Sequence, residues 1–87
     1  MTQKQFQSKF GGEIIGEWLV FDGDLDCADN NLKSLPDNLK VKGSLNCSYN
    51  NLKSLPDNLE VGRDLSCSNN KLTSIPPTIK VGGEIYQ

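Results

Sequence analysis

The chain lacks histidine altogether, and its 87 residues include only three cysteines, four prolines and one tryptophan. Without histidine, the common Ser–His and Cys–His nucleophile pairs cannot be built. A zinc site would need histidines or close pairs such as C-x-x-C, whereas Cys27, Cys47 and Cys67 are evenly spaced and far apart. We therefore expect a protein that is not an enzyme, with no catalytic residue, no metal site and no cofactor.

Long apolar runs and an excess of basic charge are also missing. No stretch approaches the ~20 apolar residues that cross a bilayer, and the first ten residues lack the apolar segment of a secretory signal. Nine basic and eleven acidic residues give a net charge of -2, which disfavours a nucleic-acid binder. We expect a single cytoplasmic domain that binds neither membranes nor nucleic acid.

A period of 20 residues dominates what is present. Residues 23–39 return as 43–59, and more loosely as 63–79. A fixed period of this size predicts a stack of short coils, each burying the apolar side of its neighbour. The three cysteines fall at one repeat position, so we interpret them as small core residues and not as disulfide partners or ligands.

Within one coil, Leu45-Asn-Cys47 alternates apolar and polar residues, which predicts a short parallel strand with Leu45 and Cys47 inward. Asn50 recurs in each repeat and is expected to turn the chain and bond backbone groups in a column. Pro56 excludes a helix on the way back. The return path is therefore predicted to be extended, polyproline II or 3₁₀.

The first 22 residues depart from the repeat and are predicted to form an N-terminal cap. Thr2 and Gln5 have the spacing of a helical capping box. Residues 15–23 align with 35–43 as a degenerate half repeat. We expect the cap to cover the first coil with its aromatic side chains, which are Phe6, Phe10 and Trp18. The second region, 23–87, contains three repeats and a terminal strand.

The C-terminal segment, 83–87, begins a fourth strand, and no capping segment follows it. An open sheet edge beside apolar side chains invites pairing with another chain. We predict that a homodimer forms through this edge, with a self-association surface made of Ile75, Ile79, Val81, Ile85 and Tyr86.

The pattern L-x-C-x-x-N-x-L-x-x-L-P-x-x-L resembles the leucine-rich repeat, with cysteine in a leucine position. The 20-residue length and the Leu-Pro step resemble the short bacterial class and the small repeat proteins of bacterial and phage genomes. The resemblance implies a right-handed solenoid with one curved parallel sheet, an irregular or extended convex side, and a protein partner on the concave face.

In that geometry the outward strand positions form columns of small, polar and acidic side chains without lysine. One interpretation is an acidic groove for a basic ligand segment, and the other is a solvated surface. Tyr49 and Tyr86 are the candidate anchors, because aromatic residues dominate interface energies. The candidate partner-binding residues are Asp24, Asp26, Asp29, Asn46, Ser48, Tyr49, Asp64, Ser66, Glu84 and Tyr86.

Three functions stay open at this point. The first is a protein-binding module that inhibits a partner of unknown identity. The second is a structural protein that assembles through its C-terminal edge. The third is an inhibitor whose acids mimic nucleic-acid phosphates, although its acids are few against the one charge per ~1.7 Å of duplex.

Overall fold

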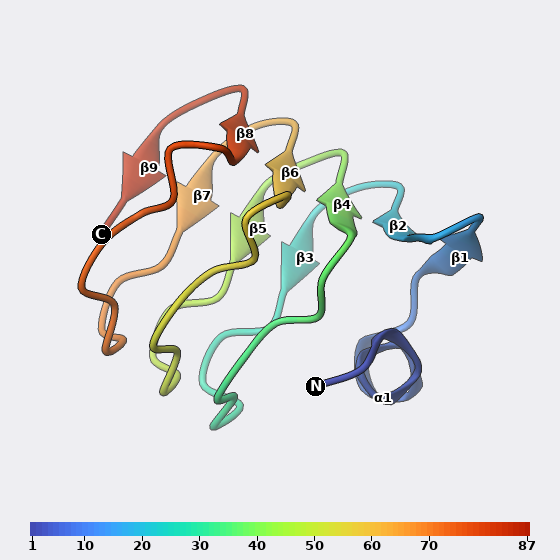
Figure 1. The fold of residues 1–87 in the computed structure, drawn as a ribbon, viewed down its shortest axis with the longest axis horizontal. Coiled ribbons are helices and arrows are strands. Elements are labelled where there is room, and N and C mark those ends of the chain that lie inside the picture. The colour runs from blue at the N-terminus through green and yellow to red at the C-terminus, as the bar shows by residue number, and fades with distance from the viewer.

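Each 20-residue repeat forms one coil of a β-solenoid of about three turns in the computed structural model, which describes residues 1–87 (Figure 1). Every coil contributes one strand to each of two sheets. We call the first the return sheet; its order is β1 (Glu13–Ile15), β2 (Trp18–Phe21), β4 (Leu39–Val41), β6 (Glu60–Val61) and β8 (Lys80–Val81). We call the second the Leu–Cys sheet; its order is β3 (Leu25–Asp26), β5 (Leu45–Asn46), β7 (Leu65–Ser66) and β9 (Ile85–Tyr86).

The prediction of a single curved sheet is wrong, because the return path is itself a second sheet. Leu39-Lys-Val41 alternates inward and outward side chains, as a half-buried strand does. The three return strands pair in parallel, with Val41 beside Val61 and Val61 beside Val81. The extended alternative for the return path is thus the one observed at these strands.

Strand register in the Leu–Cys sheet agrees with the repeat alignment. Leu25, Leu45, Leu65 and Ile85 lie side by side in successive coils. The three leucine side chains belong to a core of 17 buried apolar residues, whereas Ile85 of the last strand is exposed. The three cysteines belong to this core as free thiols, which confirms their interpretation as core residues.

The repeated asparagine bonds one coil to the next. Asn50 is buried, and its Nδ2 donates to the carbonyls of Cys27 (3.1 Å) and Cys47 (3.0 Å), two adjacent coils. Its Oδ1 accepts from the backbone N–H groups of Asn30 (3.0 Å) and Leu32 (2.9 Å). Asn70 Nδ2 repeats the pattern on the next pair of coils. The predicted asparagine column is confirmed. Its side chains provide hydrogen-bond partners for backbone groups at the turn, which have left the strand ladder.

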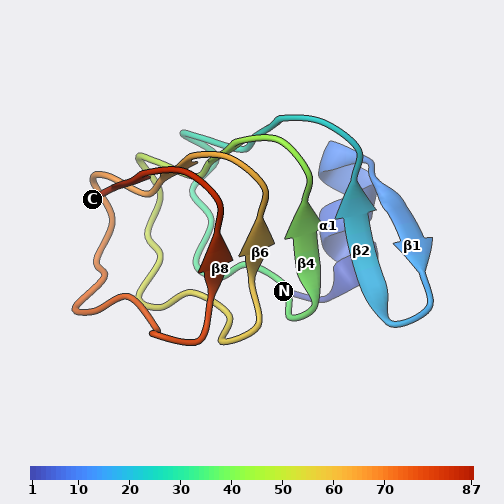
Figure 2. The same ribbon diagram turned by 90° about the horizontal axis from the view of Figure 1, so that it is seen from above.

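The N-terminal cap is a helix and a hairpin. Helix α1 (Gln3–Phe10) starts at the predicted capping box of Thr2 and Gln5, and it lies beside β1 and β2 at the end of the stack (Figure 2). Its length and composition are unsuited to crossing a bilayer. The β1–β2 hairpin, which we did not predict, turns at Gly16, where φ is +61°.

The aromatic cover of the first coil is made of three phenylalanines. The ring of Phe6 lies 4.6 Å from that of Phe10 and 6.1 Å from that of Phe21, between centroids. Trp18 was expected in this cover, but it alternates with the buried Leu19 and points to the outer face of the return sheet. The alignment of residues 15–23 with 35–43 was right. Side chains alternate between the two faces of a strand, however, and this alternation puts Trp18 on the outer face.

Asn50→Ala should destabilise the stack by about 2–4 kcal/mol, because it leaves several buried backbone groups without partners. Asn58→Ala is the matched control. Asn58 also bonds the preceding coil, through the backbone N–H and the side chain of Asn38, but it does so at the surface, where water can replace the lost partner. The substitution should cost under about 1 kcal/mol. Urea unfolding followed by circular dichroism measures both, and equal losses would contradict the role of the buried column.

Candidate protein-binding surfaces

The outer face of the Leu–Cys sheet carries the columns that the sequence predicted. Strand register places Asp26, Asn46, Ser66 and Tyr86 side by side across β3, β5, β7 and β9. Adjacent strands of a sheet lie about 4.8 Å apart. The face is therefore a dense, regular array of side chains, and it brings together most of the candidate partner-binding residues.

The column that starts at Asp24 also links successive coils. Asp24 Oδ1 accepts from the N–H of Ser44 (2.8 Å), Ser44 Oγ accepts from Asp64 (3.2 Å), and Asp64 Oδ1 accepts from Glu84 (2.9 Å). Sequence reasoning missed this backbone role. One carboxylate oxygen of each of the two aspartates accepts a backbone N–H of the following coil, and this bond fixes the position of the carboxylate.

The next column is ordered in a similar way. Asp26 Oδ1 accepts from the N–H of Ala28 (3.0 Å), and Asn46 Oδ1 accepts from that of Ser48 (3.1 Å). These local bonds hold both side chains against the ends of their strands. Ser48 itself is buried, so it adds little surface to the face.

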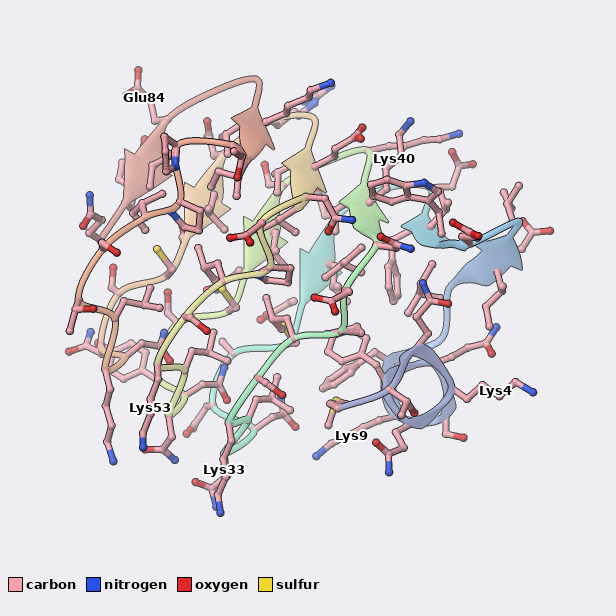
Figure 3. The ribbon with its side chains drawn as sticks, in the orientation of Figure 1. Lys4, Lys9, Lys33, Lys40, Lys53 and Glu84 are labelled. Carbon is pink, nitrogen blue, oxygen red and sulfur yellow. The ribbon has the colours of Figure 1, made fainter.

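Acidic charge on this face is not neutralised by ion pairs. The two ion pairs of the structure lie elsewhere, between Lys40 and Glu60 (3.8 Å) and between Lys42 and Asp22 (3.2 Å). Lys33 and Lys53 project from the loops at another edge of the solenoid, as Figure 3 shows. The acids without an ion-pair partner on or beside the face are Asp24, Asp26, Asp29, Asp64 and Glu84.

Tyr49 is the exceptional side chain of this surface. Three residues after β3, β5 and β7 end, the backbone is left-handed, with φ of 56° at Asp29 and 55° at Tyr49 and Asn69. Aspartate and asparagine tolerate this conformation, whereas a bulky residue is uncommon there. Tyr49 is nevertheless 63% exposed, so no burial of its ring in this chain compensates the backbone strain.

The predicted self-association residues gather on the last coil. Ile75, Ile79 and Val81 are partly buried and pack against the core. Ile85 and Tyr86, in β9, are exposed. Together they form the C-terminal end face of the solenoid, which lies opposite the helical cap (Figure 1).

A third surface was missed by sequence reasoning. On the outer face of the return sheet, apolar side chains of the β1–β2 hairpin and charged side chains of β4 and β6 surround a shallow hollow of about 340 Å³. Its lining residues are Ile15, Trp18, Val20, Lys40, Lys42 and Glu60. The signal that could have revealed it is the two-residue link Gly16-Glu17 between Ile15 and Trp18, which is typical of a hairpin.

The cysteine column has no exposed thiol for chemistry. Burial raises the pKa of Cys27 from its ordinary value of 9.0 to about 12, with a further contribution from the nearby Asp26 carboxylate. Burial likewise raises the pKa of Cys47 and of Cys67. Because the thiolate is the nucleophile and the metal ligand, these residues are inert at neutral pH. No group of three or more His, Cys, Asp or Glu side chains is arranged to hold a metal ion.

The architecture and its surfaces define the class of the protein as a β-solenoid with an N-terminal helical cap. Comparison with protein-family models, curated proteins and solved structures gave no match. The function must therefore be argued from the geometry of this chain.

The buried thiols predict that stability falls at alkaline pH. A thiol of the unfolded chain loses its proton near pH 9, while Cys27 in the fold keeps it until about pH 12. The unfolded state therefore binds fewer protons across this interval, and the free energy of unfolding decreases as pH rises through it. Urea midpoints between pH 8 and 11 measure the effect. The triple variant C27A/C47A/C67A should show a shallower decrease, and an identical slope would contradict the assignment.

Proposed function

We propose that the chain is a non-enzymatic binding module that holds a basic segment of a protein partner on the outer face of the Leu–Cys sheet. The observation that carries this proposal is the acidic array on that face. Its columns are aligned by strand register, and none of its acids is engaged in an ion pair. Inhibition of the partner would follow from covering its basic segment.

The backbone bonds of the array support binding, because they reduce the entropy lost on association. The carboxylates of Asp24, Asp26 and Asp64 are each held by a backbone N–H at 2.8–3.0 Å. The second oxygen of each carboxylate makes no hydrogen bond or ion pair within the chain, so it can accept from a basic side chain of the partner. Ordered acids at fixed spacing favour a partner with lysines or arginines at matching positions, and they speed its association electrostatically.

Tyr49 fits the role of an anchor beside this array. An exposed aromatic ring buries much area at a low cost in side-chain entropy, and such residues dominate interface energies. Strained backbone tends to persist at functional sites. The left-handed conformation of Tyr49 is a specific reason to assign it a role in binding and not in folding.

We also infer that the fold is a short form of the leucine-rich repeat. Inward Leu and Cys on one strand, followed by a buried asparagine column, support this kinship. In this interpretation the return sheet replaces the irregular convex side of the family. The Leu–Cys sheet then corresponds to the concave, partner-binding side.

The triple variant D24N/D26N/D64N tests the acidic array. Asparagine retains the side-chain oxygen that accepts each backbone N–H, so only the charge changes. We expect partner capture from lysate to fall at least about tenfold, as removal of interface charges worth over 1.4 kcal/mol would do.

The matched control for the array is E13Q/D37N/D57N, which removes the same charge from exposed positions outside the columns. It should capture the same protein at the wild-type level, with binding that weakens as salt increases. Equal capture by both triple variants would overturn the assignment of the face, and so would binding independent of salt.

Tyr49→Asn separates binding from stability. Asparagine is already present at the equivalent position 69 with the same φ, so the substitution should stabilise the fold by about 1 kcal/mol. The same variant should weaken partner binding, because the ring is lost. Urea unfolding and the binding assay read the two effects. A destabilised variant would show that the ring supports the fold, and unchanged affinity would remove Tyr49 from the site.

A further inference from the structure

The outer face of the return sheet changes in character between the cap and the repeats. Val20 of the cap begins a column that continues as Lys40, Glu60 and Lys80 on successive strands. Trp18, the only tryptophan of the chain, begins the neighbouring column, whose repeat positions carry asparagine at 38 and 58 and threonine at 78. The cap therefore presents apolar side chains where the repeats present charged and polar ones.

The β1–β2 hairpin gathers these apolar side chains into one patch. Ile15 pairs with Trp18 across the hairpin, and directly opposite residues of two paired strands lie on the same face of a sheet. Trp18 and Val20 share that face, because they alternate with the buried Leu19 and Phe21. The side chain of Ile15 is 55% exposed, and those of Trp18 and Val20 are half-buried.

The patch lies outside the core of the fold. Phe6 of α1 and the inner side chains of β2 belong to that core. Figure 2, which looks onto the return sheet, shows α1 behind the hairpin, so the helix covers the inner face and leaves the outer face open. A tryptophan on the open side of a strand, beside an isoleucine and a valine, is typical of an interaction surface.

Two lysines border the patch on the side of β4. Lys40 and Lys42 line the same hollow as the apolar side chains. Glu60 lines its far side, with Oε1 3.8 Å from the Nζ of Lys40. Asp22 is paired with Lys42 at 3.2 Å, but its side chain is 90% exposed, and neither Asp22 nor Glu13 of β1 lines the hollow. The charged side of the hollow is therefore net positive.

The two ion pairs leave these lysines available to a ligand. Both lysine side chains are about half exposed in their pairs, and exposed pairs contribute little to stability. A ligand whose apolar part covers Trp18 would exclude water from the neighbouring ammonium groups. A carboxylate placed there would be attracted more strongly than in open solvent. The hollow thus favours a ligand that joins an apolar side chain to an acidic one.

We propose that this hollow is a docking site for an acidic segment of a protein partner, with an apolar side chain seated on Trp18 and carboxylates paired with Lys40 and Lys42. Its volume of about 340 Å³ is near the lower end of the range of ligand sites, ~300–1,000 Å³, which matches one or two side chains. Because the hollow is shallow, a small molecule would stay largely exposed, whereas a peptide also covers the rim. The partner is opposite in charge to that of the acidic array.

Trp18 fluorescence gives the first test, because no other tryptophan contributes. The probe is the capped peptide Glu-Asp-Leu-Phe-Asp-Glu. Titration should move the emission to shorter wavelength and saturate, and added salt should weaken binding. The peptide Lys-Lys-Leu-Phe-Lys-Lys, with the same apolar centre, should bind at least about tenfold more weakly. Equal binding of the two peptides would overturn the proposal, and so would no response to either at millimolar concentration.

Charge variants locate the contact and keep the tryptophan as reporter. K40Q/K42Q should weaken binding of the acidic peptide at least about tenfold, because both cations of the hollow are removed. K33Q/K53Q is the matched control, since it removes the same charge from exposed loop positions that Figure 3 shows at another edge. It should bind the peptide like the wild type. Equal weakening by the two variants would indicate attraction by net charge alone and would contradict the site.

Trp18→Thr tests the apolar contact, with binding measured by isothermal titration calorimetry. Threonine is already present at the equivalent position 78, and Trp18 is not part of the buried core, so the variant should keep its circular dichroism spectrum. Its affinity for the acidic peptide should fall at least about tenfold. Unchanged affinity in the folded variant would refute the role of Trp18. A wild-type emission shift that depends on protein concentration without peptide would place a second copy in the hollow and would also refute the proposal.

Discussion

The hydrogen bonds of the repeated asparagine are the constraint on which the rest of the structure depends. A coil of 20 residues is too small to bury its own turns, and the chain must leave the Leu–Cys sheet after two strand residues. Asn50 compensates by bonding two adjacent coils at once, through carbonyls at positions 27 and 47 and through N–H groups at 30 and 32. Because each such side chain bonds its own coil to the preceding one, every coil depends on its neighbour and the stack gains stability cooperatively.

The same inter-coil bonding explains why the outer surfaces are so ordered. Asp24 and Asp64, at equivalent repeat positions, each accept a backbone N–H bond from the following coil and carry a charge on the outer face. A residue that serves the fold with one oxygen presents the other at a fixed place. Tyr49 differs from these aspartates, because its left-handed backbone is strained and its exposed ring gains no burial that would offset the strain. The acidic face that we propose for partner binding therefore combines residues that support the fold with one that opposes it.

The repeat made much of this fold predictable, because a period fixes the direction of equivalent side chains. The inward Leu–Cys strands, the asparagine column, the cysteine core and the Thr2–Gln5 capping box all followed from local pattern. The return sheet did not, since its strands are only two to four residues long and Leu52, Leu55 and Leu59 match no single period. The outward turn of Trp18 was missed for a related reason: the β1–β2 hairpin is set by pairing between strands and not by the repeat. The partner face could be listed from the sequence, but the bonds that order its carboxylates depend on the distance between coils.

Native-state hydrogen exchange by NMR tests the central claim most directly, because it reads the bonding of each coil in both sheets. The two-sheet solenoid predicts strong protection of the Leu45 and Cys47 amides, which donate within the Leu–Cys sheet, and comparable protection of the Lys42 and Gly62 amides, which donate within the return sheet. Protection confined to the Leu–Cys strands, with fast exchange at Lys42 and Gly62, would contradict the structure described for this chain.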